Sequence, residues 1–186
     1  ALDASGKMRL DSIDPLDLER ALLLWVNSPS NPSGQLDDLG AAAMWGRTHG
    51  VPVFSDECYV EFTWDGRRRT ILENGLDGVV AVHSLSKRSN LAGARVGFYA
   101  GDPDLVGYLS EVRKHVGMMV PGPAQSAAIA ALGDDAHVEE QRQRYHERLT
   151  LMANVLSEWA KCDVPMPQGG FYLWIRVGDA WAFVER

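Results

Sequence analysis

Lys87 lies in the stretch of the sequence whose residue types are best suited to covalent chemistry. In residues 81–99 (AVHSLSKRSNLAGARVGFY) an apolar run ends at Val82, a short polar loop carries the lysine, and a second apolar run follows Arg95. A lysine in cationic or desolvated surroundings loses its proton more readily, and the neutral amine condenses with a carbonyl to form a Schiff base. Lys87 is therefore a candidate for covalent catalysis, although a lone loop lysine is more often a solvated surface residue.

A carbonyl compound bound to such a lysine needs neighbouring residues that orient it and tune its electrons. Three residues of other segments can supply these interactions. Asp56 follows an apolar run and can pair with a protonated ring nitrogen, which keeps the ring an acceptor of electrons. Tyr59 and Asn31 can donate hydrogen bonds to a phenolic oxygen of the same ring. These residue types indicate a site for an aromatic aldehyde.

A phosphate group would find its ligands in the loop around the lysine. Arg95 offers a bidentate guanidinium fork, and Ser84 and Ser86 offer hydroxyl donors. Singly, these residues and those above have simpler explanations, such as a loop cap for Asp56 or an ion-pair partner for Arg95. Taken together and in this order, they predict a binding site for pyridoxal 5'-phosphate.

The elements that must position these residues follow from the apolar pattern. Short apolar runs without alternation predict strands at residues 21–26, 51–55, 78–83 and 95–100, the first of them covered on both faces. Residues 35–49 carry a helical pattern that ends before Gly50. Strand, helix and strand at these spacings indicate a parallel sheet, although the fourth strand is free to run against the others. Ligands bind beyond the strand ends of such sheets, where the polar residues fall.

Later segments predict further helices and a second domain. We expect helices at residues 103–116, 124–132 and 137–159, the last long enough to connect two domains. Residues 168–177 (QGGFYLWIRV) predict a strand of a smaller domain, and residues 179–186 the start of a helix. Because nothing like an initiator methionine precedes Ala1, we expect the sequence to be a fragment.

The composition narrows the class of protein. The 186 residues are 46% hydrophobic and 23% charged, with a formal charge of −7. An acidic chain without a basic face disfavours binding to nucleic acid or to a membrane surface. Two distant cysteines, Cys58 and Cys162, indicate a reducing compartment, and no run approaches the roughly 18 apolar residues of a membrane span. We therefore expect a cytoplasmic protein.

Three motifs carry a resemblance to a known family. NSPSNPSG, SDECY and SLSKRSNLAGARVGF resemble, in order and spacing, the cofactor motifs of the fold-type-I pyridoxal-phosphate aminotransferases of class I/II. The resemblance implies an α/β fold, with a three-layer α/β/α large domain around a mostly parallel sheet and the start of a small α+β domain. It divides the chain into residues 1–145, part of the large domain, and residues 146–186, the connecting helix and the beginning of the small domain.

The same resemblance implies roles for the seven residues. Lys87 corresponds to the internal-aldimine lysine, which also moves the proton between the substrate α-carbon and C4′ of the cofactor. Asp56 corresponds to the partner of the pyridine nitrogen. The residues at the phenolic oxygen and at the phosphate are Asn31, Tyr59, Ser84, Ser86 and Arg95. Amino-acid and 2-oxo-acid substrates and a homodimer are implied as well, and the substrate-carboxylate arginine is expected beyond Arg186.

Flanking stretches narrow the resemblance further. AGDPDLV, EVRKHVGMMVPGPAQ and ALGDDAHVEEQRQRY are similar to the succinyldiaminopimelate aminotransferases of actinobacteria, which exchange an amino group between glutamate and N-succinyl-2-amino-6-oxopimelate in lysine biosynthesis. No residue specifies that substrate. Another amino-acid aminotransferase, a pyridoxal-phosphate-dependent C–S (β) lyase and the aminotransferase-like sensor domain of a transcription regulator remain alternatives.

Overall fold

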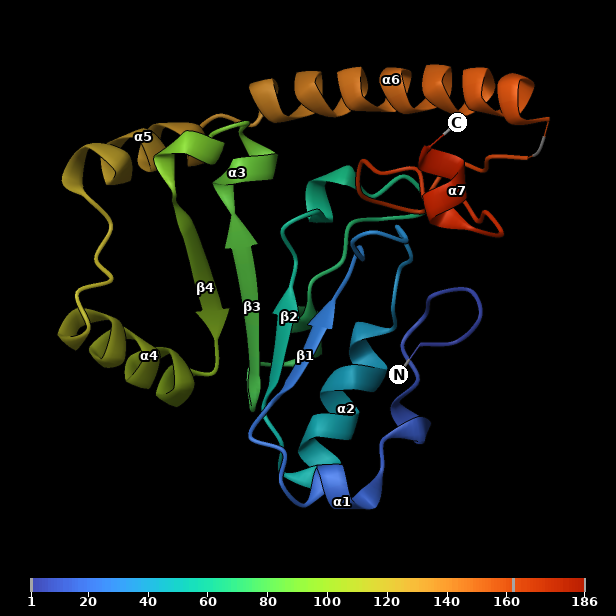
Figure 1. Cartoon of the computed structure of the whole chain (residues 1–186). Coiled ribbons are helices and arrows are strands. Elements are labelled where there is room, and N and C mark those ends of the chain that lie inside the picture. The colour runs from blue at the N-terminus through green and yellow to red at the C-terminus, as the bar shows by residue number, and fades with distance from the viewer. Residues whose placement is uncertain (1, 162, 186) are drawn as a thin grey trace.

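A mixed sheet organises the part of the chain that the computed structural model describes, residues 2–161 and 163–185 (Figure 1). Its strands, which follow one another across the sheet in chain order, are β1 (Leu24–Asn27), β2 (Val53–Asp56), β3 (Val79–Ser84) and β4 (Gly97–Gly101). Strands β1, β2 and β3 are parallel, and β4 runs antiparallel to β3. The predicted mostly parallel α/β fold is confirmed, and the fourth strand does run against the others.

Helices lie on both sides of this sheet (Figure 1). Their bounds are α1 (Pro15–Leu18), α2 (Leu39–His49), α3 (Leu85–Arg88), α4 (Pro103–His115), α5 (Gly122–Leu132), α6 (Ala136–Ala160) and α7 (Ala180–Val184). Helix α2 lies beside β1 and β2, whereas α4 and α5 lie on the β4 side and α6 lies across the edge where the parallel strands β1, β2 and β3 end. The helices predicted from the apolar pattern are therefore present, with small shifts at their ends.

Helix α2 begins four residues later than predicted because of its cap. The Asp38 side chain accepts a hydrogen bond from the Ala41 N–H (3.0 Å), which satisfies a free donor of the first turn. At the other end Gly50 adopts a left-handed conformation (φ 65°), as predicted for a C-terminal stop. The apolar face of α2 covers the sheet in a cluster of buried residues: Val26, Leu39, Ala42, Ala43, Val53, Ile71, Val79 and Ala81.

The first strand differs from its prediction. Strand β1 begins at Leu24, whose N–H donates to the Pro52 carbonyl (2.8 Å), and not at residue 21. Its side chains alternate, so Val26 faces the α2 cluster while Trp25 stacks on Phe54 of β2 (ring centroids 6.0 Å apart) and stays 53% exposed. Within the described residues β1 is thus covered on one face, and not on both.

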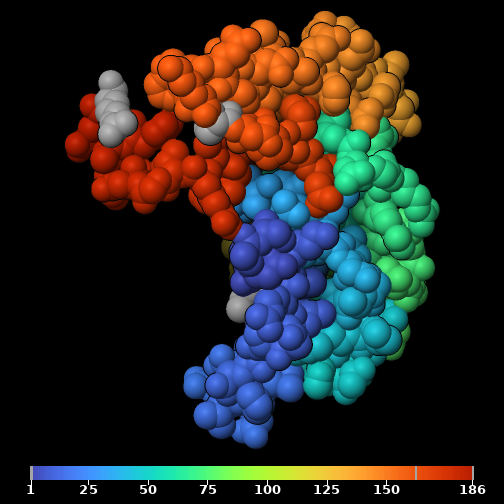
Figure 2. Space-filling model, turned by 90° about the vertical axis from the view of Figure 1, so that its right-hand side faces the viewer, coloured from blue at the N-terminus to red at the C-terminus, as the bar shows by residue number. Residues whose placement is uncertain are grey.

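The segment from Gln168 to Val177 does not form the predicted strand. In the described part of this segment the sheet pairing is a single bridge between Gly169 and Thr63. A strand needs a continuous hydrogen-bonded neighbour, whereas these residues bond to separate segments. The Gly169 N–H donates to the Gly34 carbonyl (2.8 Å), and the Gly170 N–H donates to the Phe62 carbonyl (2.9 Å). Figure 2 shows this C-terminal segment, in red, above the N-terminal residues in blue.

Helix α6 runs unbroken across the predicted domain boundary at residues 145–146. It is the longest helix described, and its first turns contact η2, the 3₁₀ turn at Val60–Phe62. Among the described helices none is both long and apolar enough to span a membrane. The division into two domains and the cytoplasmic location remain predictions from the sequence, and Cys162 lies outside the described residues.

Two glycines inside helices provide a test of the packing of α2 on the sheet. A Cβ atom at Gly46 would lie 2.4 Å from Val53 Cγ2 and 2.7 Å from the Val51 carbonyl oxygen, whereas a Cβ at Gly107 of α4 would meet nothing within 4 Å. Alanine usually stabilises a helix by about 0.5 to 1 kcal/mol relative to glycine. We expect Gly107→Ala to raise the free energy of unfolding by that amount. Gly46→Ala should instead lower it by about 1 to 2 kcal/mol, because the surrounding atoms must move to relieve the clash.

Urea unfolding followed by circular dichroism measures both free energies of unfolding. A Gly46→Ala variant as stable as Gly107→Ala would contradict the close contact between α2 and β2.

Candidate active site

The carboxyl ends of β1, β2 and β3 bring the predicted site residues to one edge of the sheet. The parallel register pairs Asn27 with Asp56, and Asp56 with Val82. The Asn27 side-chain amide also donates to the Asp56 carbonyl (3.0 Å), which ties the first two strand ends together. The loops that carry Asn31, Tyr59 and Lys87 therefore start from adjacent points, as the sequence predicted.

Asn31 is held by the loop that follows β1. Its backbone N–H donates to Asn27 Oδ1 (2.7 Å), and its side-chain Nδ2 donates to the Tyr59 hydroxyl (3.3 Å). The Asn31–Pro32 bond is cis, and so is the Ser28–Pro29 bond. The structure thus joins Asn31 and Tyr59, the two residues predicted to face a phenolic oxygen.

Tyr59 is buried at the start of η2, and its hydroxyl has a second partner besides the Asn31 amide. Its hydroxyl lies 2.9 Å from that of Tyr172, and its ring packs edge-on against those of Phe171 and Tyr172. Burial raises the pKa of Tyr59 well above its ordinary value, and the hydrogen bond with the Tyr172 hydroxyl raises this pKa further. Tyr59 therefore keeps its proton at physiological pH and remains able to donate a hydrogen bond.

Lys87 lies in the short helix α3, directly after β3. The helix is capped by Ser84, whose Oγ accepts a hydrogen bond from the Ser86 N–H (3.2 Å). The Lys87 amine lies over the Tyr59 ring, with Nζ 5.8 Å from the ring centroid. Lys87, Tyr59 and Asn31 thus form one connected group, although they are far apart in the sequence.

Asp56 ends β2 and orients the turn that leads to Tyr59. Its Oδ1 accepts a hydrogen bond from the Cys58 N–H (3.1 Å). Burial, reinforced by this carboxylate, raises the pKa of the Cys58 thiol to about 12. Cys58 is therefore protonated at neutral pH and is poorly suited to act as a nucleophile.

The predicted phosphate ligands are brought together only in part. Ser84 and Ser86 meet at the start of α3, where the Ser84 hydroxyl serves as the cap. Arg95 lies at the far end of the same loop in a left-handed conformation (φ 54°), with an exposed side chain that donates to the Ala92 carbonyl (3.0 Å). The contacts described for Arg95 do not reach either serine, so its role at a phosphate remains a prediction.

Two residues beside the site escaped the sequence interpretation. Asn27 belongs to the first motif but positions Asn31 and Asp56 instead of facing a ligand. Tyr172 belongs to the QGGFYLW segment, where it was assigned only to a strand. No spacing rule places Tyr172 on Tyr59, because the contact depends on how the C-terminal segment folds back.

The C-terminal segment can fold back onto the site because Gly34 and Gly169 approach each other closely. A Cβ atom at Gly34 would lie 2.6 Å from the Gly169 carbonyl oxygen, and one at Gly169 would lie 2.6 Å from Pro29 Cβ. Gly34 also has φ 70°, a conformation that side chains disfavour. The glycines of the first motif and of QGGFYLW thus allow Tyr172 to reach Tyr59.

A buried acid lies behind the site. Glu57 is fully buried, with Oε1 accepting from the Ile71 N–H (2.8 Å) and Oε2 lying 3.4 Å from His83 Nε2. His83 also stacks on Phe98. Burial lowers the pKa of His83 in spite of the opposing effect of Glu57. His83 thus combines core packing with a contact to a carboxylate, away from the described contacts of Lys87.

Comparisons with known proteins identify the family. Residues 5–185 match the family described as aminotransferase class I and II, so the chain belongs to this family. Members of this family use pyridoxal 5'-phosphate as their cofactor.

Individual relatives agree with this assignment. The chain is 45% identical over 183 residues to the 4-dedimethylamino-4-oxo-anhydrotetracycline transaminase OxyQ of Streptomyces rimosus. The matched region covers 92% of this chain and 51% of OxyQ. It is 43% identical over 180 residues to the probable aminotransferase Rv1178 of Mycobacterium tuberculosis, and this match covers 92% of the chain and 43% of Rv1178. The chain therefore spans about half the length of the curated relatives it matches.

A solved structure confirms the fold. Substrate-bound BacF from Bacillus subtilis matches with a TM-score of 0.85 at 28% identity, over 95% of this chain and 46% of BacF.

The residues at the strand ends fit this cofactor by their chemistry. They offer an amine for its aldehyde, a carboxylate for its pyridine nitrogen, and a phenol with an amide for its phenolic oxygen. The Asn31–Tyr59 hydrogen bond and the Lys87–Tyr59 contact place three of these groups together. These groups are thus suited to pyridoxal 5'-phosphate. The residues predicted to bind its phosphate, Ser84, Ser86 and Arg95, are the ones that the structure brings together least.

The raised thiol pKa of Cys58 can be tested by alkylation. Because the pKa is about 12 in the native protein against 9.0 for an ordinary thiol, we expect native Cys58 to react with iodoacetamide at pH 8 about 1,000-fold more slowly than in urea. A Cys162→Ser background removes the second thiol, and mass spectrometry follows the adduct. Since the unfolded thiol loses its proton first, stability should also fall as the pH rises above 9.0.

Equal rates in native and unfolded protein would mean that Cys58 is not shielded, and would contradict the packing of the Asp56–Tyr59 turn.

Proposed function

We propose that the protein carries out pyridoxal-phosphate-dependent transamination between an amino acid and a 2-oxo acid. The observation that carries this proposal is the position of Lys87 Nζ, 5.8 Å from the centroid of the Tyr59 ring, with Tyr59 in turn bonded to Asn31. A primary amine, a neutral phenol and an amide donor gathered at parallel strand ends suit the binding of an aromatic aldehyde. Membership of the aminotransferase class I and II family supports the same reaction class.

Each residue has a task in this reaction. The cofactor, when bound, supplies an electron sink for charge that develops at the substrate α-carbon. With the cofactor bound, the Lys87 amine would hold its aldehyde carbon, and the same amine would move a proton between the substrate α-carbon and C4′. The Asp56 carboxylate would pair with the pyridine nitrogen and keep it protonated, which would increase the electron demand of the ring.

The remaining residues bind and orient. Asn31 and Tyr59 donate hydrogen bonds to the phenolic oxygen, and the raised pKa of Tyr59 keeps its proton available for that purpose. Ser84, Ser86 and Arg95 bind the phosphate. Because Arg95 bonds to the Ala92 carbonyl, this task requires its side chain to turn toward the start of α3.

For the substrate, we propose N-succinyl-LL-2,6-diaminopimelate with 2-oxoglutarate and glutamate, a step in lysine biosynthesis. Sequence similarity to the succinyldiaminopimelate aminotransferases supports this choice, as does a 32% identical relative named LL-diaminopimelate aminotransferase in Aquifex aeolicus. A second candidate acceptor is a ring ketone, because OxyQ, 45% identical, is named as the transaminase of an oxo-anhydrotetracycline. We further propose a homodimer and the division into domains at residues 145–146.

An absorption experiment tests the reaction class. The chain is produced with whatever native sequence flanks it, pyridoxal 5'-phosphate is added, and glutamate follows. We expect a visible band from the lysine-bound cofactor that glutamate converts to the band of the amino form. The Lys87→Ala variant should show neither change, since it lacks the amine. Lys114→Ala is the matched control, because this exposed α4 lysine pairs with Glu111 and should leave the spectra unchanged.

The outcomes separate the alternatives. A lysine-dependent band that glutamate leaves unchanged would favour a lyase or a sensor domain over a transaminase. The absence of any band in the wild type would refute the site. Adding N-succinyl-2-amino-6-oxopimelate or a ring ketone to the amino form then identifies the acceptor, because only a true acceptor restores the first band.

A further inference from the structure

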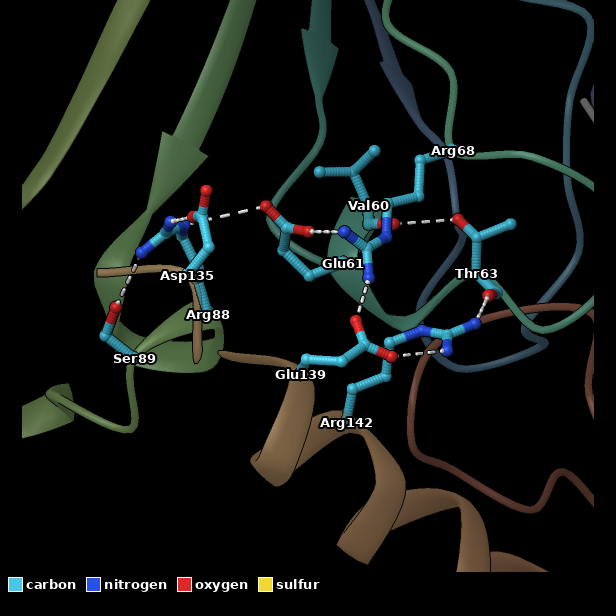
Figure 3. Close-up of polar contacts among 9 residues, drawn as sticks. All are labelled: Val60, Glu61, Thr63, Arg68, Arg88, Ser89, Asp135, Glu139 and Arg142. Atoms are coloured by element: carbon cyan, nitrogen blue, oxygen red, sulfur yellow. Dashed lines mark hydrogen bonds and ion pairs between the residues drawn. The ribbon is translucent and has the colours of Figure 1, made fainter. Parts of the chain in front are cut away.

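Arg88 directly follows Lys87 and is fixed by four partners, of which Figure 3 shows Ser89, Asp135 and Glu61. One terminal nitrogen donates to the Ala131 carbonyl (2.9 Å) and to Ser89 Oγ (3.2 Å), and the other donates to Asp135. Its Nε lies 3.5 Å from Glu61 Oε1. The side chain is 13% exposed, so this arginine is an internal connector and not a solvated surface residue.

The contact with Glu61 links the lysine to Tyr59. Glu61 lies in η2, the turn that Tyr59 begins. The pair therefore joins the helix that carries Lys87 to the turn that carries Tyr59. The Lys87 amine lies over the Tyr59 ring between these same two elements. A shift of one element relative to the other would change the distance between the two groups.

Helix α3 needs such a link because it is short. It spans only Leu85–Arg88, and a single helical turn has little stability of its own. Its apolar anchor is Leu85, which packs with Val96 and Ala128 on the side of α5. That cluster fixes the start of α3, whereas the polar contacts of Arg88 fix its end.

The ion pairs continue from Glu61 to helix α6 (Figure 3). Glu61 Oε2 lies 2.9 Å from Arg68, which also lies 2.8 Å from Glu139. Glu139 in turn pairs with Arg142 (3.2 Å), which donates to the Thr63 carbonyl (2.8 Å). These charges connect the Lys87 helix, the Tyr59 turn and the first turns of α6.

Exposure separates the parts of this network. Arg68 and Glu139 are 42% and 61% exposed, and pairs so open to water contribute little. Arg88 and Glu61 are 13% and 20% exposed, and their geometry is fixed by other hydrogen bonds of the guanidinium. The Arg88–Glu61 link is therefore the part of the network that holds two elements in position.

We propose that Arg88 is a positioning residue, which acts through Glu61 to fix the Lys87 amine relative to Tyr59. The inference rests on the proposed function, since it concerns the same site. It assigns Arg88 no contact with substrate or cofactor. It predicts instead that loss of the link leaves cofactor and substrate binding largely intact but slows the step in which the Lys87 amine moves a proton.

The test compares Arg88→Gln, Glu61→Gln and the double variant in the natural full-length protein. We expect Arg88→Gln to lower kcat about tenfold with KM for glutamate nearly unchanged, because misplacement of a reacting group affects the chemical step. Glu61→Gln should lower kcat in the same way, and the double variant should be no worse than Arg88→Gln, since both break one link. Arg144→Gln is the control, because its pair with Glu140 is exposed and lies apart from the network.

A second measurement uses the cofactor-free protein. Hydrogen exchange at residues 86–91 reports the stability of α3, where the Ser89 and Leu91 N–H groups donate to the Leu85 carbonyl. We expect exchange there to become about tenfold faster in Arg88→Gln and Glu61→Gln, with no change in Arg144→Gln. Exchange in β1, which lies away from the link, should not change in any variant.

The results distinguish the two levels of inference. The wild-type spectrum judges the proposed function, whereas the comparison of variants with wild type judges the role of Arg88. Folded variants with wild-type exchange and kcat, or losses that simply add in the double variant, would overturn the positioning role. If Arg88→Gln does not fold, Glu61→Gln decides: slower turnover with faster exchange supports the role, and wild-type behaviour overturns it.

Discussion

The parallel hydrogen bonding of β1, β2 and β3 places Asn27, Asp56 and Val82 side by side, and the site depends on this register. Each strand passes directly into a turn that presents one group. The side chain of Asn27 reinforces the arrangement by binding both the Asp56 carbonyl and the Asn31 N–H. A shift of one strand by a single residue would turn every side chain to the opposite face and separate these groups.

A second constraint comes from the far end of the chain. The approach of Gly169 to Gly34 brings Tyr172 to the Tyr59 hydroxyl, and it encloses Tyr59 among aromatic rings. This enclosure raises the pKa of Tyr59 and keeps it a proton donor. The C-terminal segment thus contributes to the electrostatics of the site through packing, without supplying a charged group.

The parts that the sequence predicted are those set by local chemistry. Apolar runs identify the strands, Gly50 ends α2, and the polar residues after the strands share one edge of the sheet because parallel strands end together. The family motifs added the roles of Lys87 and its partners, which the local pattern alone leaves open. The structure brings Asn31, Tyr59 and Lys87 together, and their roles at a cofactor stay predictions.

What escaped prediction depends on contacts between distant segments. The QGGFYLW segment has the apolar composition of a strand, yet its backbone bonds to Gly34 and to Phe62 of η2, and it presents Tyr172 to the site. Trp25 belongs to an apolar run but lies on the face of β1 that α2 does not cover. Arg88 resembles any basic loop residue until its partners Glu61 and Asp135 are known.

We infer that Lys87 is the residue that bonds to the cofactor. The most direct measurement is to add pyridoxal 5'-phosphate to the natural protein, reduce with borohydride, digest, and locate the modified lysine by mass spectrometry. We expect one reduced adduct, on Lys87, with Lys7, Lys114 and Lys161 unmodified at stoichiometric cofactor. An adduct on another lysine, or none on Lys87, would contradict it.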